Sequence, residues 1–297
     1  MMLAITGGTG FVGGALIRHA AAAGHRIRAL ARRPQPPTEQ VEWVAGALDD
    51  AAALDRLVAG AEAVVHVAGV VNAPDRVGFV AGNVEGTRAI LRAAQGVERF
   101  VHVSSLAARE PALSNYGWSK AEAERLVEAS ALPWTIVRPP GIYGPGDLDQ
   151  LDLFRLARRG LAFLPPPGRL SLIAVDDLAR LLLRLAIHDA PRTIYEVDDG
   201  GDGWTHDGYA RAIGAAVGQR VLPMHLPRAL LSLIAWGDRR LRSDRARLTA
   251  DRVSYFCHPD WTVDPAKRPP AALWQPSIPT PRGLADTANW YRANGLL

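Results

Sequence analysis

Short apolar runs alternate with amphipathic, helix-like segments along the first half of the chain. The apolar run 2–6 is typical of a buried strand, and a glycine-rich turn and a helical stretch at 15–23 follow it. The succession then repeats, with strand-like runs at 26–32, 41–44, 63–67, 100–103 and 134–137 and helix-like segments at 50–59, 83–94 and 120–131. Such an alternation predicts a doubly wound α/β fold, in which right-handed crossovers join the strands of a parallel sheet.

The pattern changes after Gly144, where prolines interrupt the alternation. The run Pro165–Pro167 is typical of a loop, whereas residues 171–184 are typical of a return to the sheet. Further on, helical segments dominate, and we expect a terminal helix at 283–293. Two domains interleaved in sequence are therefore predicted. The sheet domain comprises residues 1–144 and about 170–200, and a smaller, mostly helical lobe comprises residues 145–169 and about 201–297.

The amino-acid composition is that of a globular protein, and it bears on the cellular compartment in which the protein is expected. Hydrophobic residues make up 48% and charged residues 22% of the 297 positions, which excludes a disordered or collagen-like chain. The single cysteine, Cys257, cannot form an intrachain disulfide, so we expect a reducing compartment, the cytoplasm. No apolar run approaches the about 20 residues that cross a bilayer, and no signal-peptide pattern opens the sequence. We therefore predict no membrane span.

Arginine dominates the positive charge. Among the 34 basic residues only Lys120 and Lys267 are lysines, so a motif that contains a lysine draws on a small supply. The densest basic stretch, Asp238–Arg252, has no aromatic residues within it, and we interpret it as a solvated helix face rather than a nucleic-acid contact. No nucleic acid is therefore expected among the partners.

Three glycines, Gly7, Gly10 and Gly13, separate the first strand from the first helix. Glycines in this position permit a tight turn, a close approach of the backbone to a pyrophosphate, and close packing of the helix on the sheet. The helix N-terminus then faces the negative charge of the phosphates. The turn predicts a dinucleotide-binding fold of the Rossmann type, with Gly7, Gly10, Phe11, Val12 and Gly13 against the cofactor.

The segment Thr6–Gly13 (T-G-G-T-G-F-V-G) resembles the signature of the extended short-chain dehydrogenase/reductase superfamily, which includes the NAD-dependent epimerases and dehydratases. The resemblance implies a nicotinamide dinucleotide as cofactor. It also implies that the stretch around Ala68 and Gly69, after the strand at 63–67, passes the cofactor with its backbone. Asn83, on the following helix, is interpreted as structural.

The turn after the second strand bears on the choice between NADP(H) and NAD(H). A site for NAD places a carboxylate there to accept from the ribose hydroxyl, whereas a 2′-phosphate favours guanidinium groups. Arg32 and Arg33 occupy this turn, so NADP(H) is favoured and NAD(H) stays possible; the alternative is that both are solvated loop residues. After the third strand the family carries Gly-Asp-Leu, with the Asp near the adenine. Here Leu48 precedes Asp49, and either that contact is lost or Asp49 replaces it.

A Tyr-x-x-x-Lys pair, Tyr116 and Lys120, lies at the start of a predicted helix, where residues four apart project from the same face. A neighbouring ammonium lowers the pKa of a phenol from about 10, so Tyr116 can exchange a proton near neutral pH. Ser105, after the strand at 100–103, adds a hydroxyl that can hold the reacting oxygen, with Ser104 as the alternative. By resemblance, Ser105 is the catalytic hydroxyl, Tyr116 the general acid/base, and Lys120 the group that binds the nicotinamide ribose and tunes the tyrosine.

The segment Arg138–Asp147 (R-P-P-G-I-Y-G-P-G-D) resembles the branch of dihydroflavonol reductases and 3-beta-hydroxysteroid dehydrogenases. It differs from the nucleotide-sugar branch because Gly141 replaces an asparagine that meets the sugar nucleotide. We expect Pro139 and Ile142 to touch the nicotinamide, and the substrate to be a small, relatively apolar molecule. The apolar stretch 226–236 is interpreted as core of the smaller lobe, with a lining of the substrate cavity as the alternative.

These observations predict an NAD(P)-dependent oxidoreductase that moves a hydride between the nicotinamide and a carbonyl or hydroxyl carbon, with Tyr116 moving the proton. An epimerase or dehydratase acting on a sugar or nucleotide sugar is the alternative within enzymes. A dinucleotide-binding sensor or assembly subunit without turnover is the alternative of another class. No metal is expected, since no two histidines have the spacing of helical metal ligands. A homodimer is implied by resemblance only.

Overall fold

The computed structural model describes residues 1–36, 38–188, 192–242 and 248–297, so residues 243–247 of the basic stretch lie outside the described residues. The chain forms two compact units. The sheet unit comprises Met1–Pro139, Asp176–Glu196 and Lys267–Gln275, and the second unit comprises Pro140–Val175, Val197–Ala266 and Pro276–Leu297. The predicted domain boundaries stay a prediction, because compact packing alone does not establish units that fold independently.

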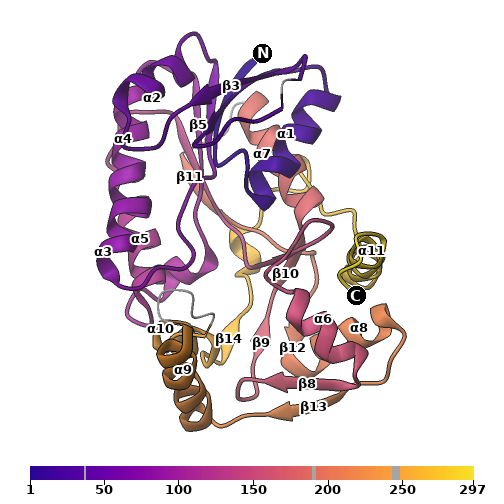
Figure 1. The fold of residues 1–297 in the computed structure, drawn as a ribbon. Helices are drawn as coiled ribbons and strands as arrows, with labels where there is room; N and C mark the ends of the chain where they lie inside the picture. The colour runs from indigo at the N-terminus through magenta and orange to yellow at the C-terminus, as the bar shows by residue number, and fades with distance from the viewer. Residues whose placement is uncertain (37, 189–191, 243–247) are drawn as a thin grey trace. The chain divides into compact units, whose positions relative to one another are not determined.

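Seven parallel strands form the sheet of the sheet unit (Figure 1). In chain order they are β1 (Met2–Thr6), β2 (Arg26–Ala31), β3 (Val41–Ala45), β4 (Ala63–His66), β5 (Arg99–Val103), β6 (Trp134–Arg138) and β11 (Thr193–Glu196). Their order across the sheet is β11-β6-β5-β4-β1-β2-β3. This Rossmann-type order confirms the predicted fold class. It places a switch in winding direction between β1 and β4, and such sheets bind ligands outside the carboxyl ends of the strands at that point.

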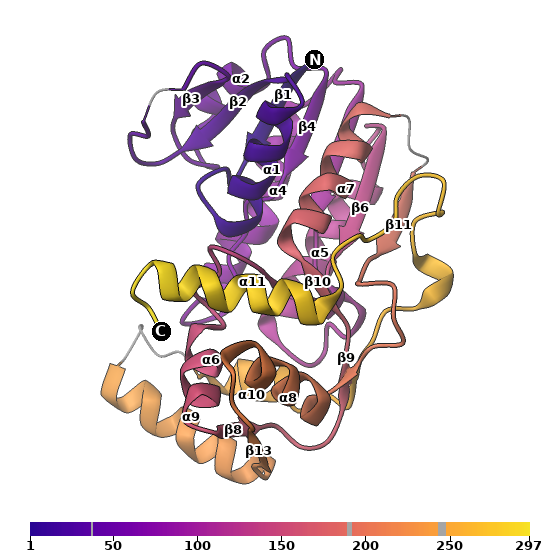
Figure 2. The same ribbon diagram turned by 90° about the vertical axis from the view of Figure 1, so that its right-hand side faces the viewer.

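Helices cover both faces of this sheet (Figures 1 and 2). On one face lie α2 (Ala51–Val58), α4 (Gly86–Ala93) and α5 (Asn115–Glu128), and on the other α1 (Phe11–Ala22) and α7 (Val175–Ile187). Before α4 the chain forms a short helix, α3 (Arg76–Phe79), and a π-helical segment, Val80–Glu85. Helix α5 begins at Asn115 rather than at residue 120, because Ser114 Oγ caps it by accepting the backbone N–H of Gly117 (2.9 Å).

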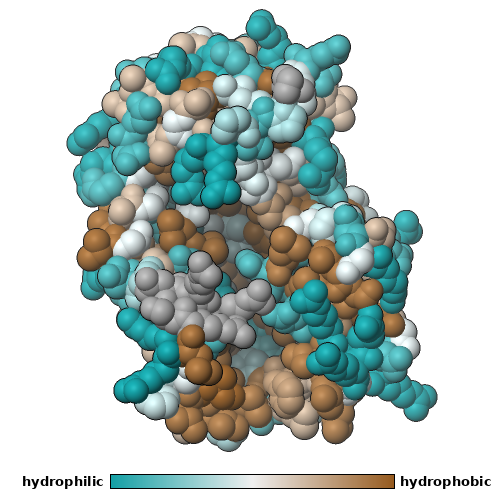
Figure 3. Space-filling model, viewed as in Figure 1, coloured by the Kyte–Doolittle hydropathy of each residue, from teal (hydrophilic) through white to brown (hydrophobic). Residues whose placement is uncertain are grey.

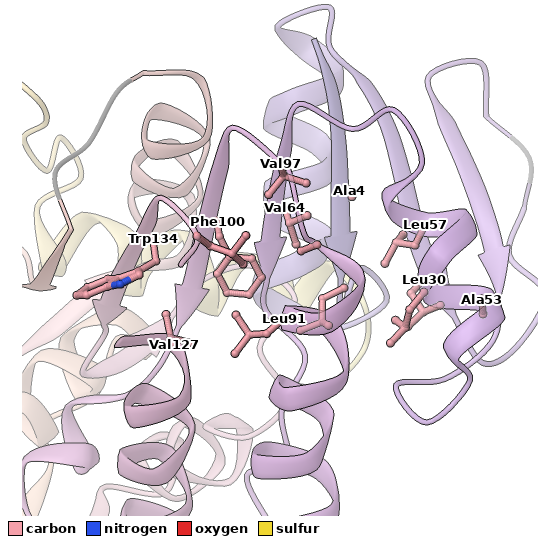
Figure 4. Packing of buried hydrophobic residues seen from close by; sticks show 14 of the residues in the cluster. Ala4, Leu30, Ala53, Leu57, Val64, Leu91, Val97, Phe100, Val127 and Trp134 are labelled. Atoms are coloured by element: carbon pink, nitrogen blue, oxygen red, sulfur yellow. The ribbon is translucent and has the colours of Figure 1, made fainter. Parts of the chain in front are cut away.

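A core of apolar side chains fills the space between the sheet and α2, α4 and α5. Figure 4 shows Leu57, Leu91 and Val127 from the helices beside Val64 and Phe100 from the strands. Val64 and Phe100 have no exposed surface, as expected for parallel strands that are covered on both faces. Burial of a side chain of this size contributes about 1.5–3 kcal/mol. The core therefore fixes the strand ends from which the candidate site is built.

The second unit combines short strand pairs with helices. Its strands are β7 (Gly141–Tyr143), β8 (Leu161–Leu164), β9 (Arg169–Leu170), β10 (Leu172–Ala174), β12 (Trp204–Thr205), β13 (Leu222–His225) and β14 (Asp260–Trp261). Its helices are α6 (Leu151–Arg158), α8 (His206–Val217), α9 (Arg228–Arg242), α10 (Ala250–Phe256) and α11 (Thr280–Ala293). Tyr143, Phe154 and Tyr291 are fully buried in its core, and Tyr143 Oη donates to Thr280 Oγ1 (3.2 Å).

The interpretation of residues 226–236 as core is wrong. Within α9, Leu230, Leu233, Ile234 and Trp236 are exposed, and Ala235 is the buried residue among them. Helix α9 packs against α10, and the Asp238 carboxylate accepts the backbone N–H of Leu248, but these contacts leave the four apolar side chains exposed. None of the described helices is long and apolar enough to cross a membrane.

Candidate active site

The glycine turn after β1 leaves room for phosphates beside the N-terminus of α1. Gly7 adopts a positive φ of 73°, and its carbonyl accepts the backbone N–H of Gly10 (3.0 Å). A Cβ on Gly13 would lie 2.1 Å from that same carbonyl oxygen, and a Cβ on Gly7 would lie 2.7 Å from the Ala68 nitrogen. No side chain fits at either position. The turn therefore leaves a backbone-lined surface at a helix N-terminus, which is suited to a pyrophosphate.

Buried hydrogen bonds join the ends of β1 and β4 behind this turn. The Thr6 hydroxyl and His66 Nδ1 are 2.7 Å apart, and the backbone N–H of Ala68 donates to Thr6 Oγ1 (3.2 Å). His66 Nε2 is 3.1 Å from Thr87 Oγ1 on α4. Burial, and secondarily the charge of Lys120, lowers the pKa of His66 to about 3. The imidazole is therefore neutral at physiological pH and holds the loop at Ala68 in place.

Lys120 extends from α5 to the carboxyl ends of the central strands. Its Nζ donates to the carbonyl oxygen of Val103, the last residue of β5 (2.8 Å). The same Nζ lies 3.4 Å from where a Cβ on Gly69 would be, so it also faces the segment after β4. The side chain is buried, and burial lowers its pKa to about 8 although Glu124 acts to raise it. An ammonium is thus held at the edge of the sheet where ligands bind in this fold.

Asn83 fixes the segment after β4 against α5. Its Oδ1 accepts the backbone N–H of Val70 (2.6 Å), and its Nδ2 donates to the Val70 carbonyl (2.9 Å) and to Ser119 Oγ (2.9 Å). It lies in the π-helical segment Val80–Glu85, and segments of this kind occur frequently at functional sites. Asn83 therefore has the structural role that the sequence predicts.

Ser105 follows β5 and begins a short 3-10 helix. Its Oγ accepts the backbone N–H of Ala107 (3.2 Å), which leaves the hydroxyl hydrogen able to donate elsewhere. Ser104 is also buried, and its Oγ has no hydrogen-bond partner in the part of the chain that the structure describes. The carbonyl of Pro139 accepts the backbone N–H of Leu106 (2.9 Å), so Pro139 lies beside the serine pair.

Tyr116 lies in the first turn of α5, one turn before Lys120. Its half-buried ring is 6.2 Å from the ring of Phe79 on α3, measured between centroids. Because Lys120 is hydrogen-bonded to Val103, two residues before Ser105, the structure brings Ser105, Tyr116 and Lys120 to one edge of the sheet. Their catalytic roles stay a prediction.

The residues predicted at the other end of the cofactor lie after β2 and β3. Arg32 and Arg33 are exposed, and neither guanidinium has an ion-pair partner among the described residues. Asp49 is exposed as well, whereas Leu48 is half-buried and packs against the core. Ile142 belongs to β7 of the second unit, and its contact with the nicotinamide stays a prediction.

Comparison with known proteins identifies the family. A family model described as NAD(P)H-binding matches residues 7–188. The ceramide reductase of Caulobacter vibrioides is 38% identical over the whole of this chain and 96% of its own length. The chain belongs to the NAD(P)H-binding family that this model describes. A putative dihydroflavonol 4-reductase of Synechocystis is 40% identical over 22% of this chain and 20% of its own, which confirms the predicted likeness to that branch.

The fold of this NAD(P)H-binding protein also matches solved structures. MoeE5 in complex with UDP-glucose and NAD aligns over 99% of both chains with a TM-score of 0.76 at 23% identity, which shows a common fold. The curated relatives are reductases. The chain is therefore an enzyme of the NAD(P)-dependent oxidoreductase or epimerase type, and the prediction of an enzyme is confirmed.

A buried ion-pair network behind Lys120 was not predicted. Arg138 donates to both carboxylate oxygens of Glu124 (2.8 and 2.6 Å), and Glu124 lies one turn after Lys120 on α5. Arg138 also lies 3.5 Å from the fully buried carboxylate of Glu196 on β11, which Arg109 approaches at 3.2 Å. The four-residue spacing of Lys120 and Glu124 indicates that these two side chains are neighbours on one helix face, and the sequence could have predicted this part of the network. Glu196 is distant in sequence, and no local pattern indicates its partners.

Proposed function

We propose that this chain is an NADPH-dependent reductase of a carbonyl group on a ceramide-like lipid. The observation that carries the proposal is the full-length similarity to a ceramide reductase. Ceramides bear hydroxyl groups on a long-chain base, so the reducible substrate is a lipid of this class with a carbonyl in place of one hydroxyl. The proposed substrate is apolar, as expected from the sequence, but it is a long-chain lipid rather than the small molecule that the sequence predicts.

Ser105 and Tyr116 would act together on the carbonyl oxygen. Ser105 Oγ, which accepts from Ala107, donates its hydrogen to that oxygen and orients it. Tyr116 Oη transfers its proton to the same oxygen while the carbonyl carbon gains a hydride. The C=O π bond breaks, a C–H and an O–H bond form, and the tyrosine regains a proton from solvent. Lys120, buried beside the end of β5, favours the deprotonated tyrosine through its charge.

The residues present fit a dinucleotide. NADPH, when bound, supplies the hydride and is oxidised to NADP⁺. The turn at Gly7 and Gly13 would hold the pyrophosphate, and Lys120 Nζ the nicotinamide ribose. Arg32 and Arg33, exposed and unpaired among the described residues, would bind the 2′-phosphate.

The test is turnover of a defined lipid ketone. We would incubate purified protein with NADPH and a 3-oxo ceramide, follow absorbance at 340 nm, and detect the alcohol by mass spectrometry. Tyr116→Phe should lower turnover by about 10²–10⁴-fold while the Kd for NADPH changes less than about twofold. Unchanged turnover in Tyr116→Phe would exclude the role of the tyrosine. Tight NADPH binding without reduction of any lipid ketone would exclude the substrate class.

An epimerase or dehydratase is the second candidate, because the solved neighbour MoeE5 holds UDP-glucose and NAD. The curated reductase relatives and Gly141, at the position of the family's sugar-binding asparagine, favour the reductase. Conversion of UDP-glucose with no net change at 340 nm would reverse this preference.

A further inference from the structure

Helix α9 of the second unit presents an apolar row to the outside. Leu230, Leu233, Ile234 and Leu241 are 41, 62, 44 and 89% exposed. Side chains spaced by three, four and seven residues fall on one face of a helix, so these four form a single row, which we call the α9 stripe. Amphipathic helices of globular proteins turn such a face toward the core. In α9 the apolar face points away from the protein.

A different side of α9 contacts the protein. Ala235 is buried, and the carboxylate of Asp238 accepts the backbone N–H of Leu248 (3.0 Å). At the start of the helix, Arg228 donates to Ser254 Oγ on α10 (3.1 Å). These contacts fix which way the helix faces. The α9 stripe is therefore exposed through the packing of the unit and does not result from a loose end.

Exposed apolar side chains continue onto the strand pair that leads into α9. Phe163 of β8 and Leu222 of β13 are both exposed, and the two strands pair in parallel. Figure 3 shows hydrophobic surface over α9 and over the β8–β13 pair, at the lower edge of the view. Apolar surface gathered in this way marks an interaction site.

Basic and aromatic side chains flank the α9 stripe. Arg240 is exposed beside the stripe, and its guanidinium lies 4.9 Å from the ring centre of Trp236, itself exposed. Arg239 is also exposed but projects from the side of α9 opposite the stripe. Asp238, the one acidic residue of α9, is turned toward the protein. Leucine, tryptophan and arginine in this arrangement are typical of helices that lie in the interface of an anionic bilayer.

We propose that α9 binds the surface of an anionic phospholipid bilayer. The α9 stripe would insert at the boundary between headgroups and acyl chains, and Arg240 at its edge would pair with a lipid phosphate. A second copy of this chain is a poorer partner, because two α9 faces would bring like charges together. The inference goes beyond the proposed function and does not depend on it, since it stands on the exposed face of α9 alone.

The experiment is flotation of the full-length chain with lipid vesicles. One set contains phosphatidylglycerol and phosphatidylcholine, and the other contains phosphatidylcholine alone. We expect binding to the anionic set at low salt, with at least a tenfold lower partition coefficient on the neutral set. Raising the salt concentration should weaken binding to the anionic set.

Two matched double variants separate the α9 stripe from apolar exposure in general. Leu230→Glu with Leu233→Glu changes two stripe residues that are 41 and 62% exposed. Leu153→Glu with Leu148→Glu changes two leucines of the same unit that are 39 and 61% exposed. The first pair should lower the anionic partition coefficient at least tenfold, and the second should leave it within twofold. Unchanged NADPH binding, read from nicotinamide fluorescence, shows that each variant is folded.

Equal effects of the two double variants, or no binding of the unchanged chain to anionic vesicles, would overturn the proposal. A dimer in sedimentation that only the α9 variant abolishes, without vesicle binding, would instead assign the face to a second copy. Vesicle binding by a chain that reduces no lipid ketone would leave this inference standing and refute the proposed substrate.

Discussion

At the scale of single residues, Lys120 combines a functional position with an energetic cost. Its ammonium is buried, and burial lowers the lysine pKa from 10.5 to about 8. The hydrogen bond to the Val103 carbonyl and the charge of Glu124 offset only part of the lost hydration. A core position with no role in the reaction would be expected to hold an apolar side chain. The cost therefore supports the assignment of Lys120 to the site.

We predict that Lys120→Met stabilises the cofactor-free protein at pH 7 and abolishes turnover. Below pH 8 Lys120 is protonated in both the folded and the unfolded protein. The folded state therefore carries the full free-energy cost of burying the ammonium, of order 3 kcal/mol. Between pH 8 and 10.5 the unfolded state binds more protons, so the stability of the unchanged protein rises with pH. Urea denaturation should show that the free energy of unfolding of the variant exceeds that of the unchanged protein by less at pH 10 than at pH 7. A variant less stable than the unchanged protein at pH 7 would contradict this account.

Arg32 allows a second test at this scale. Arg32→Ala should weaken NADPH binding about tenfold or more, since a charge-assisted hydrogen bond contributes about 1.5–3 kcal/mol. NADH binding should change little. Arg26→Ala is the matched control, because Arg26 is exposed at the opposite end of the same strand. Equal losses for NADPH and NADH would refute the assignment to the 2′-phosphate.

At the scale of elements, the junction of β1 and α1 depends on backbone approaching backbone. Gly13 lies in the first turn of α1 with the Gly7 carbonyl where its Cβ would be, whereas a Cβ on the next residue, Gly14, would meet nothing closer than 3.7 Å. The two adjacent glycines therefore differ in how much space surrounds them. Of these two, only Gly13 must lack a side chain for the turn to form.

This difference predicts opposite outcomes for two alanine substitutions. Gly13→Ala should move the turn and weaken NADPH binding by about 100-fold or more, because carbonyl and Cβ cannot both stay in place. Gly14→Ala should keep the affinity and stabilise the protein by about 1 kcal/mol, the helix preference of alanine over glycine. Nicotinamide fluorescence and thermal melting measure the two effects. Similar affinities for the two variants would show that the turn does not hold the pyrophosphate.

At the scale of the whole molecule, two buried histidines link the stability of the sheet unit to pH. The rings of His66 and His102 stack at 5.3 Å on neighbouring strands of the sheet. Burial, then the charge of Lys120, lowers the pKa of each well below 6.5. The unfolded chain takes up protons on these histidines as pH falls below 6.5, but the folded chain does not. Stability is therefore lost from pH 6.5 downward.

We predict that His102→Leu makes the protein less sensitive to acid. Neither ring nitrogen of His102 has a hydrogen-bond partner among the described residues, so leucine removes no bond there. The unchanged protein should lose several kcal/mol of unfolding free energy between pH 7 and pH 4, and the variant distinctly less. Urea denaturation at both pH values gives the comparison. Parallel losses in the two proteins would place the acid sensitivity elsewhere.

Much of the sheet and the chemical groups of the site could be predicted because their signals are local. Strand runs, the glycine turn, and the Tyr116–Lys120 spacing all lie within a few neighbouring residues. Strand β11 was missed because only two of its four residues are apolar, whereas the equally short β4 has three apolar residues in a row. The outward face of α9 was misread as core because an apolar period shows which side chains share a face but not where that face points.

The sequence by itself determined the alternation of strands and helices that predicts a doubly wound sheet, the cofactor class and the types of residue at the candidate site. Each of these follows from short-range periodicity, turn stereochemistry and motif spacing. Only the tertiary structure decided that Lys120 meets Val103 and Gly69, that Glu196 is buried among distant arginines, and that the α9 stripe is exposed. Such contacts join residues far apart along the chain, and their burial depends on packing that no local pattern encodes.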